Sequence, residues 1–367
     1  MLSTLITLLV LVIILGVLVF VHELGHFLAA RANGVRVEEF AFGFRPKIWS
    51  KKIGETVYAI NAIPLGGYVK MYGETDAGET GPKSYHDKNP WQKFSILLAG
   101  AFANLVLGWL ILTILFMTGF DPIYPGIAAN PFVGNLQPVV VQVVAKDSPA
   151  AQAGLQVNDQ LVAVNGSKVA TSAEFIEAID QDKGTLTTIE YKRADSTQIV
   201  TVTPRVNPPE GEGAVGVEIT AAGRVSTQAY RAPIAAFYET GRIIKISAEG
   251  FYDFVKTLLV QRQVSQNVTG IIGVGEMTGV ARTLGFSYLA QLVALVTIGL
   301  GVINLLPVLP LDGGHIIVVV YEGITRRKVT EKQFGWLAAV GLALVIVLFL
   351  IVTVKDIIRF DILGRFF

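Results

Sequence analysis

Four long apolar segments constrain this chain more than any other feature of its sequence. They cover approximately residues 4–28, 94–118, 289–311 and 334–354. An α-helix needs about 20 apolar residues to cross the ~30 Å hydrocarbon core of a bilayer. Only 16% of the residues are charged, whereas about a quarter are charged in a soluble globular protein. We therefore expect a polytopic α-helical membrane protein with four transmembrane helices.

The basic residues predict how these helices are oriented. Lys and Arg are frequent in the loop 31–93 and form a cluster in the loop 322–333, where Arg326, Arg327 and Lys328 are consecutive. Such residues favour the cytoplasmic side of a membrane. We expect these loops to face the cytoplasm, and the N-terminus and the polar region 121–288 to lie outside. The net charge of +1 gives no reason to expect a nucleic-acid partner.

The external region predicts a small α/β domain over residues 128–206. A β-rich run covers Val139 to Val144, a short helix begins after Ser148 and is closed by Gly154, and Asn165-Gly166 indicates a tight turn. The segment 207–288 then reads as a linker. It contains an amphipathic helix from about Pro233, which lies on the outer membrane surface or packs against the α/β domain.

The loop 31–93 predicts a hydrophobic β-hairpin instead of a fifth span. Strand-like residues surround the turn Gly54-Glu55-Thr56, and Pro64-Leu65-Gly66-Gly67-Tyr68-Val69-Lys70 follows. Non-helical backbone is tolerated at membrane depth only where protein or a water-filled cavity covers it. A membrane-associated hairpin on the cytoplasmic side would present an edge to an unwound substrate. The alternative is a hairpin at the protein surface.

The first apolar segment contains His22-Glu23-Leu24-Gly25-His26. On a helix the two histidines share one face, so both imidazoles can bind one metal ion, and the intervening glutamate can accept a proton from water. Ionisable side chains inside a span cost ~2.5–3.5 kcal/mol on insertion scales for Asp, Lys or Arg and are usually functional. The motif predicts a metalloprotease site with Glu23 as the catalytic base.

Tetrahedral zinc needs a further protein ligand beside two histidines and a water. The chain has no cysteine, so the candidate must be His, Asp or Glu, and Asp312 is placed at a depth in the third span similar to that of His22 in the first. His315 is interpreted as a packing residue or as one that supports a ligand. Pro307 and Pro310 predict local unwinding beside the metal. Asn304 either binds the substrate backbone or makes an interhelical contact.

Taken in order, these motifs resemble the site-2 protease family, and more narrowly the bacterial regulator of sigma-E protease (RseP) type. The elements that carry the resemblance are the histidine motif, Phe42-Gly43-Phe44, the Gly66-Gly67 segment, a PDZ-like external domain and the segment from Asn304 to His315. The resemblance implies one Zn²⁺ ion held by His22, His26 and Asp312. It also implies that Gly43, Gly66 and Gly67 bind the substrate.

The family resemblance further implies a multi-pass protein of the bacterial inner membrane, with an extracytoplasmic PDZ-like domain and an active site near the cytoplasmic side. Its substrates would be transmembrane proteins, such as anti-sigma factors, or leftover signal peptides. The PDZ-like domain binds a peptide by strand addition or is a folded spacer. The catalytic membrane domain would comprise residues 1–120 and 289–367.

The sequence departs from the family in three places. One PDZ-like domain is evident where the enterobacterial form has two, Pro310 lies one position later than the family's second proline, and Ile271 stands where the family usually has proline. Two other functions fit parts of the pattern: an inactive relative that binds membrane spans, and a zinc transporter. Glu23 together with three candidate ligands argues against the first, and the apolar run Leu5 to Phe20 argues against the second.

Overall fold

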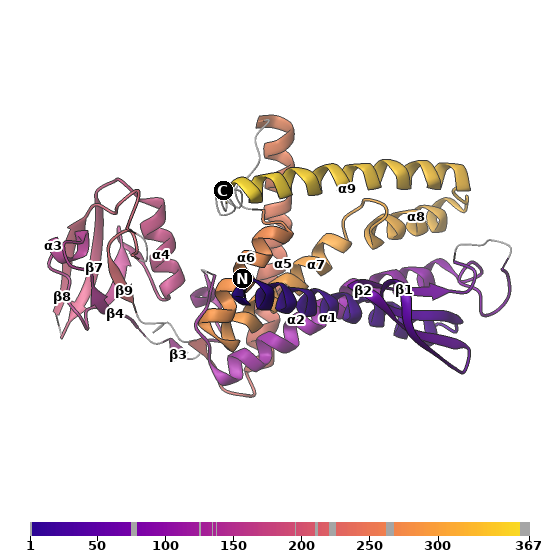
Figure 1. Cartoon of the computed structure of the whole chain (residues 1–367), viewed down its shortest axis with the longest axis horizontal. Coiled ribbons are helices and arrows are strands. Elements are labelled where there is room, and N and C mark those ends of the chain that lie inside the picture. The colour runs from indigo at the N-terminus through magenta and orange to yellow at the C-terminus, as the bar shows by residue number, and fades with distance from the viewer. Residues whose placement is uncertain are drawn as a thin grey trace. The chain divides into compact units, whose positions relative to one another are not determined.

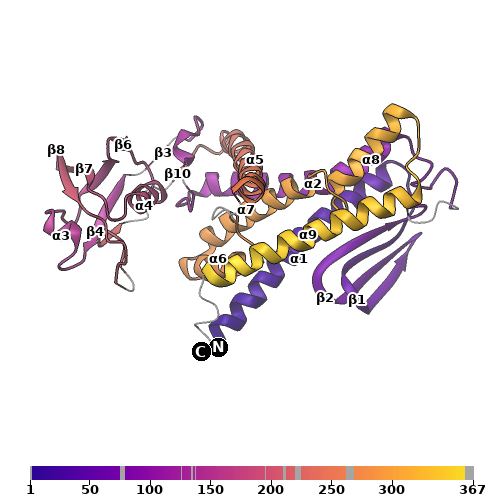
Figure 2. The same ribbon diagram turned by 90° about the horizontal axis from the view of Figure 1, so that it is seen from above.

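The computed structural model describes residues 2–74, 79–124, 126–133, 135–136, 138–194, 196–209, 212–219, 225–261 and 268–359 (Figures 1 and 2). The chain forms two compact units. One comprises residues 1–108, 240–284 and 292–367, and the other comprises residues 109–239 and 285–291.

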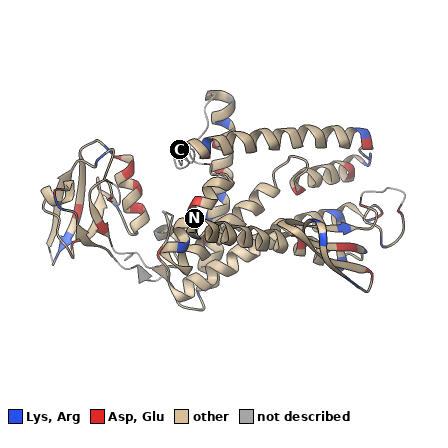
Figure 3. Cartoon of the chain, in the orientation of Figure 1, with Lys and Arg blue, Asp and Glu red and all other residues tan. Residues whose placement is uncertain are grey.

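The four predicted spans are confirmed as helices long and apolar enough to cross a membrane. They are α1 (Leu2–Ala32), α2 (Pro90–Thr118), α7 (Phe286–Asn304) and α9 (Glu331–Arg359). Figure 3 shows that charged residues are nearly absent from the middle of the long helices. Almost none of the most apolar part of α9 is buried in the protein. Apolar residues around the whole helix are expected where the surroundings are lipid.

The third span is shorter than the predicted 289–311. Helix α7 ends at Asn304, and a non-helical segment leads to α8 (Asp312–Thr325). Pro307 and Pro310 lie in this segment and lack the backbone donors that a helix needs, so the predicted unwinding is confirmed. Gly313 and Gly314 form the first turn of α8 against the backbone of residues 305–309, where any Cβ atom would overlap it.

The loop 31–93 forms the predicted hairpin, with β1 (Val37–Ile53) and β2 (Thr56–Met71) joined by Gly54-Glu55. Both strands double back on themselves. Residues 39–42 pair with 67–70 and also with 57–60, while residues 47–53 pair with 56–61. The result is a sheet of four segments, visible as the curved ribbons in Figure 2. The segment 67–71 is one of its edges.

The hairpin packs against the C-terminal half of α1. A shared core contains Phe27, Val37, Phe40, Met71 and Ile96 together with their buried neighbours. The ring centroids of Phe27 and Phe40 lie 5.0 Å apart. Ile96 belongs to α2, so this core holds the hairpin edge beside two of the long helices.

The segment 207–288 contains more structure than the predicted linker. Helix α5 (Ala232–Lys256) matches the amphipathic prediction and is followed by a π-helical turn (Thr257–Gln261). Helix α6 (Ile271–Leu284) was not predicted. It packs on α1, with Arg282 donating to Ser3 Oγ at 2.8 Å. Its several glycines conceal the helical periodicity. Asp356 of α9 accepts hydrogen bonds from the amides of Gly270 and Gly273 at the start of α6.

The predicted α/β domain is present in the second unit. Its main sheet has the strand order β8-β7-β5-β4-β9, with β6 paired to β5. The elements are β4 (Val139–Val144), α3 (Pro149–Gln152), β5 (Gln160–Val164), β6 (Ser167–Lys168), α4 (Ser172–Gln181), β7 (Thr187–Arg193), β8 (Ser196–Val202) and β9 (Val217–Ile219). Because β9 pairs with β4, the sheet extends beyond the predicted boundary at residue 206. A three-residue strand has too few positions to show a periodic pattern.

The predicted turns of this domain are confirmed. Ser148 caps α3 by accepting from the Ala151 amide, and Asn165-Gly166 closes the β5–β6 hairpin with positive φ at both residues. Phe175 and Ile179 of α4 enter the core. By sequence, residues 132–136 are only a loose version of the loop with which PDZ domains bind a peptide carboxylate, and Gly134 in it lies outside the described residues. The end of this segment forms β3 (Asn135–Leu136), which pairs with β10 (Val225–Ser226), and a 3₁₀ turn precedes it at Ile127–Ala129.

Candidate metal centre

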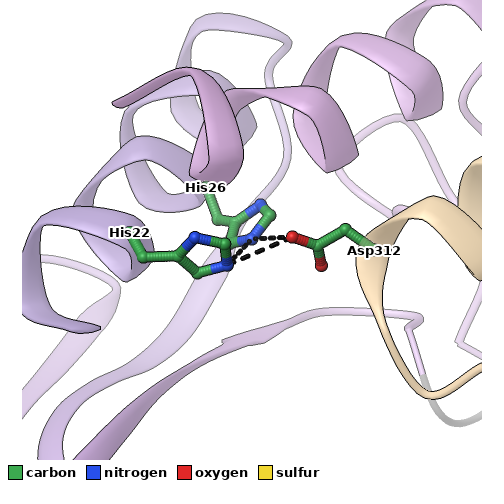
Figure 4. A group of neighbouring side chains, drawn as sticks. All are labelled: His22, His26 and Asp312. Carbon is green, nitrogen blue, oxygen red and sulfur yellow. Dashed lines mark hydrogen bonds and ion pairs between the residues drawn. The ribbon is translucent and has the colours of Figure 1, made fainter. Parts of the chain in front are cut away.

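Three side chains from α1 and α8 converge on one point, as the sequence predicts. His22 and His26 lie one turn apart on α1, both are buried, and their Nε2 atoms are 3.1 Å apart. Asp312, at the start of α8, places Oδ2 3.1 Å from His22 Nε2 and 3.4 Å from His26 Nε2 (Figure 4). Within the described residues, these three form the one His/Asp/Glu group with the spacing to hold a metal ion.

The spacing of these atoms fits a tetrahedral ion. Ligands bound at ~2.0–2.1 Å in tetrahedral geometry lie roughly 3.3 Å from one another. The three measured separations, 3.1, 3.1 and 3.4 Å, fall around this value. Asp312 Oδ2 has no hydrogen-bond donor in the described part of the chain, and the two imidazole nitrogens are the atoms that approach it. The donor set of two imidazoles and one carboxylate suits zinc.

Contacts to the Nδ1 atoms orient the two imidazole rings. The Nδ1 of His26 lies 2.8 Å from the Ile96 carbonyl, which can only accept, so the proton is on Nδ1 and the Nε2 lone pair faces the cluster. His22 Nδ1 lies 3.3 Å from Nδ2 of Asn104 and 3.4 Å from Nδ2 of Asn304. Asn104 Oδ1 is buried without a hydrogen-bond partner in the described part of the chain. Exchanging the oxygen and nitrogen of this amide would pair the oxygen with Nδ1–H and fix the same tautomer for His22.

Asn104 was not predicted, whereas Asn304 was predicted either to bind the substrate backbone or to make an interhelical contact. Asn104 of α2 is completely buried, and a polar residue inside the apolar run 94–118 was the signal that could have identified it. The Asn304 amide contacts His22. This contact matches the interhelical alternative for Asn304.

Glu23 lies in a cavity of about 180 Å³ next to the cluster. The lining residues are His22, Glu23, His26, Tyr68, Val69, Met71, Glu74, Leu97, Asp312 and His315. The Glu23 carboxylate accepts a hydrogen bond from the Val69 amide, which belongs to the edge segment 67–71 of the hairpin. The cavity therefore joins the metal-ligand cluster, a carboxylate and a strand edge.

A second carboxylate, that of Glu74, lines the same cavity and was not predicted. Glu74 Oε2 accepts from the Met71 amide at 3.2 Å, two residues after the amide that Glu23 engages. Burial raises the pKa of the Glu74 carboxyl. Two amides of the sheet edge are thus satisfied by acidic side chains, and an exposed edge is otherwise open to pairing with another strand. The sequence signal that could have identified Glu74 is its position in Gly73-Glu74, shortly after the end of β2 at Met71.

The three glycines predicted to bind substrate differ in their surroundings. Gly67 lies on the edge segment, where an added Cβ would be 3.2 Å from Glu23 Cγ. Gly43 and Gly66 have φ values of 83° and 149° at the bends of the hairpin. An added Cβ would meet the Ile63 carbonyl at Gly43 and the Phe44 ring at Gly66. The bends of the hairpin therefore explain why glycine is needed at positions 43 and 66.

His315 lies outside the group of three ligands. Its Nδ1 lies 3.0 Å from the Leu311 carbonyl one turn earlier in α8, and its ring is 5.6 Å from that of Phe334. It also lines the cavity. These contacts agree with its interpretation as a packing or supporting residue.

Glycines let α2 approach the histidines closely. A Cβ on Gly100 would overlap His26 Nε2 and His22 Cε1, and a Cβ on Gly25 would overlap the Ala99 carbonyl. We expect Gly100→Ala to weaken metal binding about 10–100-fold, the range typical of disturbing the partners of a ligand. Competition with a chelator measures the affinity.

The matched control is Gly299→Ala on α7, where an added Cβ meets no atom within 4 Å. Both changes raise helix propensity by the same roughly 1 kcal/mol, so only the clash with the imidazoles differs. Equal metal affinity in the two variants would contradict the role given to Gly100.

Comparison with known proteins adds to this geometry. The profile of peptidase family M50 matches residues 10–348. A protein of Clostridium acetobutylicum named "putative zinc metalloprotease" is 31% identical over 94% of this chain and 95% of its own length. The zinc metalloprotease RasP of Geobacillus kaustophilus is 26% identical over 98% of this chain and 100% of its own length. The solved PDZ domain of an SdrC-like protein from Listeria monocytogenes matches 24% of this chain and 92% of its own, at 26% identity and a TM-score of 0.22.

Proposed function

Because the chain belongs to peptidase family M50, the site-2 proteases, and is a membrane metalloprotease, we propose that it cuts single-span membrane proteins inside the bilayer. The observation that carries this proposal is the convergence of His22, His26 and Asp312 beside Glu23, with both histidines on a helix able to span a membrane. Candidate substrates are anti-sigma factors and leftover signal peptides in a bacterial inner membrane, with the PDZ-like domain outside and the active site near the cytoplasmic side.

In the proposed mechanism, His22, His26 and Asp312 hold one zinc ion, which when bound polarises the scissile carbonyl and acidifies water. Glu23 accepts the proton of the attacking water and delivers it to the leaving amine. The Ile96 carbonyl keeps the His26 proton on Nδ1, so that Nε2 is available to the metal. Asn104 and Asn304 orient His22 from its other ring nitrogen.

We place the substrate along the edge segment 67–71. A helical substrate keeps its peptide carbonyls hydrogen-bonded, so the cleaved segment must become extended before Glu23 can act on it. The edge passes Glu23 at Gly67 and Val69, and an extended peptide can pair with such an edge. Gly67 has no side chain, so the substrate backbone can approach the edge at this position.

The function is tested with the purified full chain and a model single-span substrate. We expect cleavage within the apolar span, loss of cleavage on chelation and recovery when Zn²⁺ is added back. A substrate whose span has Leu in place of helix-destabilising Gly and Pro should be cut more slowly, since Gly and Pro disfavour a helix by ~1 and ~3 kcal/mol. Product masses locate the cleaved bond.

Cleavage that persists after the metal has been removed would contradict the metalloprotease mechanism. Cleavage confined to residues outside the span would contradict an intramembrane site. Equal rates for the two substrates would show that unwinding of the substrate does not limit the reaction.

A further inference from the structure

A second hollow shares no lining residue with the cavity at the metal-ligand cluster, and five of its ten lining residues are Lys or Arg. It measures about 370 Å³ and lies between the segment before α2, the end of α8 and the loop before α9. The lining residues are His86, Asp87, Lys88, Pro90, Lys93, Val319, Glu322, Arg326, Arg327 and Lys328. Five Lys and Arg side chains thus meet two carboxylates, which gives the hollow a net positive charge.

The two carboxylates are bound to other partners. Asp87 accepts from the Gly81 amide at 2.6 Å and contacts the His86 ring. Glu322 accepts from the Val329 amide at 2.9 Å. Within the described residues, none of the five cations forms an ion pair with a carboxylate. Several unpaired cations around one hollow repel one another, and an anion in the hollow would remove that repulsion.

The cations are held in place by other contacts. Lys88 Nζ donates to the Pro82 carbonyl, and Lys93 Nζ lies 5.4 Å from the centre of the Tyr85 ring. Lys328 Nζ lies 3.0 Å from His86 Nε2. The positive end of α2 and the negative end of α8 both border the hollow and offset each other. The side chains therefore decide the sign of the potential.

The surroundings place the hollow at the level of lipid headgroups. Two candidate spans begin beside it, α2 at Pro90 and α9 at Glu331. Trp91, in the first turn of α2, and Trp336, in the second turn of α9, have exposed fractions of 79% and 67%. Exposed tryptophans at span ends lie at the membrane–water interface. Basic pockets between helices at this level suit phospholipid headgroups.

From these observations we infer that the hollow binds the phosphate of an anionic phospholipid, with Arg326 and Arg327 on one wall and Lys88 and Lys93 on the other. The ligand chemistry is a phosphate diester fixed by charge-assisted hydrogen bonds from Lys and Arg. A zwitterionic lipid offers the same phosphate with a neutralising ammonium beside it, so it should bind more weakly.

The test measures lipid retained by the delipidated full chain in neutral detergent, by native mass spectrometry. The probes are phosphatidylglycerol, phosphatidylcholine and inorganic phosphate. We expect phosphatidylglycerol to bind in preference to phosphatidylcholine. Arg326→Gln/Arg327→Gln should weaken phosphatidylglycerol binding about 30-fold. Each basic residue near an anionic surface contributes roughly 1 kcal/mol, and the double variant removes two of them. Lys51→Gln/Lys52→Gln, on the exposed hairpin, removes the same charge and should leave binding nearly unchanged.

Three results would overturn the inference. They are equal weakening by the hairpin control, unchanged binding in the pocket variant, and displacement of phosphatidylglycerol by an equal concentration of inorganic phosphate, which would show a free-anion site. If Arg326→Gln/Arg327→Gln fails to elute as a folded monodisperse species, Lys88→Gln/Lys93→Gln on the opposite wall decides by the same criteria.

Discussion

Glu23→Gln should lower the rate of substrate cleavage by a factor on the order of 100 to 10,000, the usual contribution of a general base, while the metal content stays unchanged. Glutamine keeps the size of the side chain and can still accept from the Val69 amide, but it cannot take a proton from water. Glu23 is also outside the group of three ligands. Single-turnover cleavage and elemental analysis of the same preparation measure the two quantities.

Glu74→Gln is the matched control, because Glu74 lines the same cavity and also accepts from an edge amide. We expect it to lose much less activity than Glu23→Gln. If both variants lose activity equally, the result would show that activity depends on the total negative charge of the cavity and would not identify Glu23 as the general base. If Glu23→Gln cleaves at the rate of the unaltered protein, the proposed mechanism is wrong.

Asp312→Ala should release the metal and abolish cleavage together. It removes the one carboxylate among the three converging side chains and leaves two imidazoles with an open face. The fall in metal affinity should exceed the ~10–100-fold that follows from losing a partner behind a ligand. Elemental analysis after dialysis against a weak chelator measures the occupancy, and the model substrate measures the activity.

His315→Ala tests the same assignment from the other side. His315 lies three residues further along α8 and lines the cavity, but its Nδ1 and its ring are engaged by Leu311 and Phe334. We expect it to keep its metal. A variant at His315 that loses metal as fully as Asp312→Ala would make His315 a ligand, and an Asp312→Ala protein that retains metal would exclude the proposed ligand set.

Much of the site was predictable because its residues follow strong local rules. The spacing of His22 and His26 places both on one helix face. The depth argument for Asp312 identified a residue that does converge with them, although α7 ends at Asn304 and Asp312 begins α8. The residues that contact the ligand side chains follow no local sequence rule. Asn104 is a single polar residue in an apolar run, and its contact with His22 depends on how α1 and α2 pack. Gly100 is needed for the same packing.

The fold was predictable to a similar extent. Turn residues such as Asn165-Gly166 and the prolines after Asn304 act over a few positions. They identified a real chain reversal and the unwinding after α7, although the span was predicted to continue to residue 311. Register and long-range pairing were not accessible. Nothing in the order of residues indicates that 39–42 would pair on both sides, or that the short strand β9 would complete the sheet around β4.

The three converging side chains also have a bearing on the synthesis of the protein. His22 and His26 leave the ribosome 290 and 286 residues before Asp312. Since the chain emerges from its N-terminus at about 5–20 residues per second, the first helix waits roughly 15–60 seconds for its third ligand. The cleavage that we propose needs all three ligands, so it cannot begin before α8 has been synthesised, and a truncated chain that lacks α8 should not cut its neighbours.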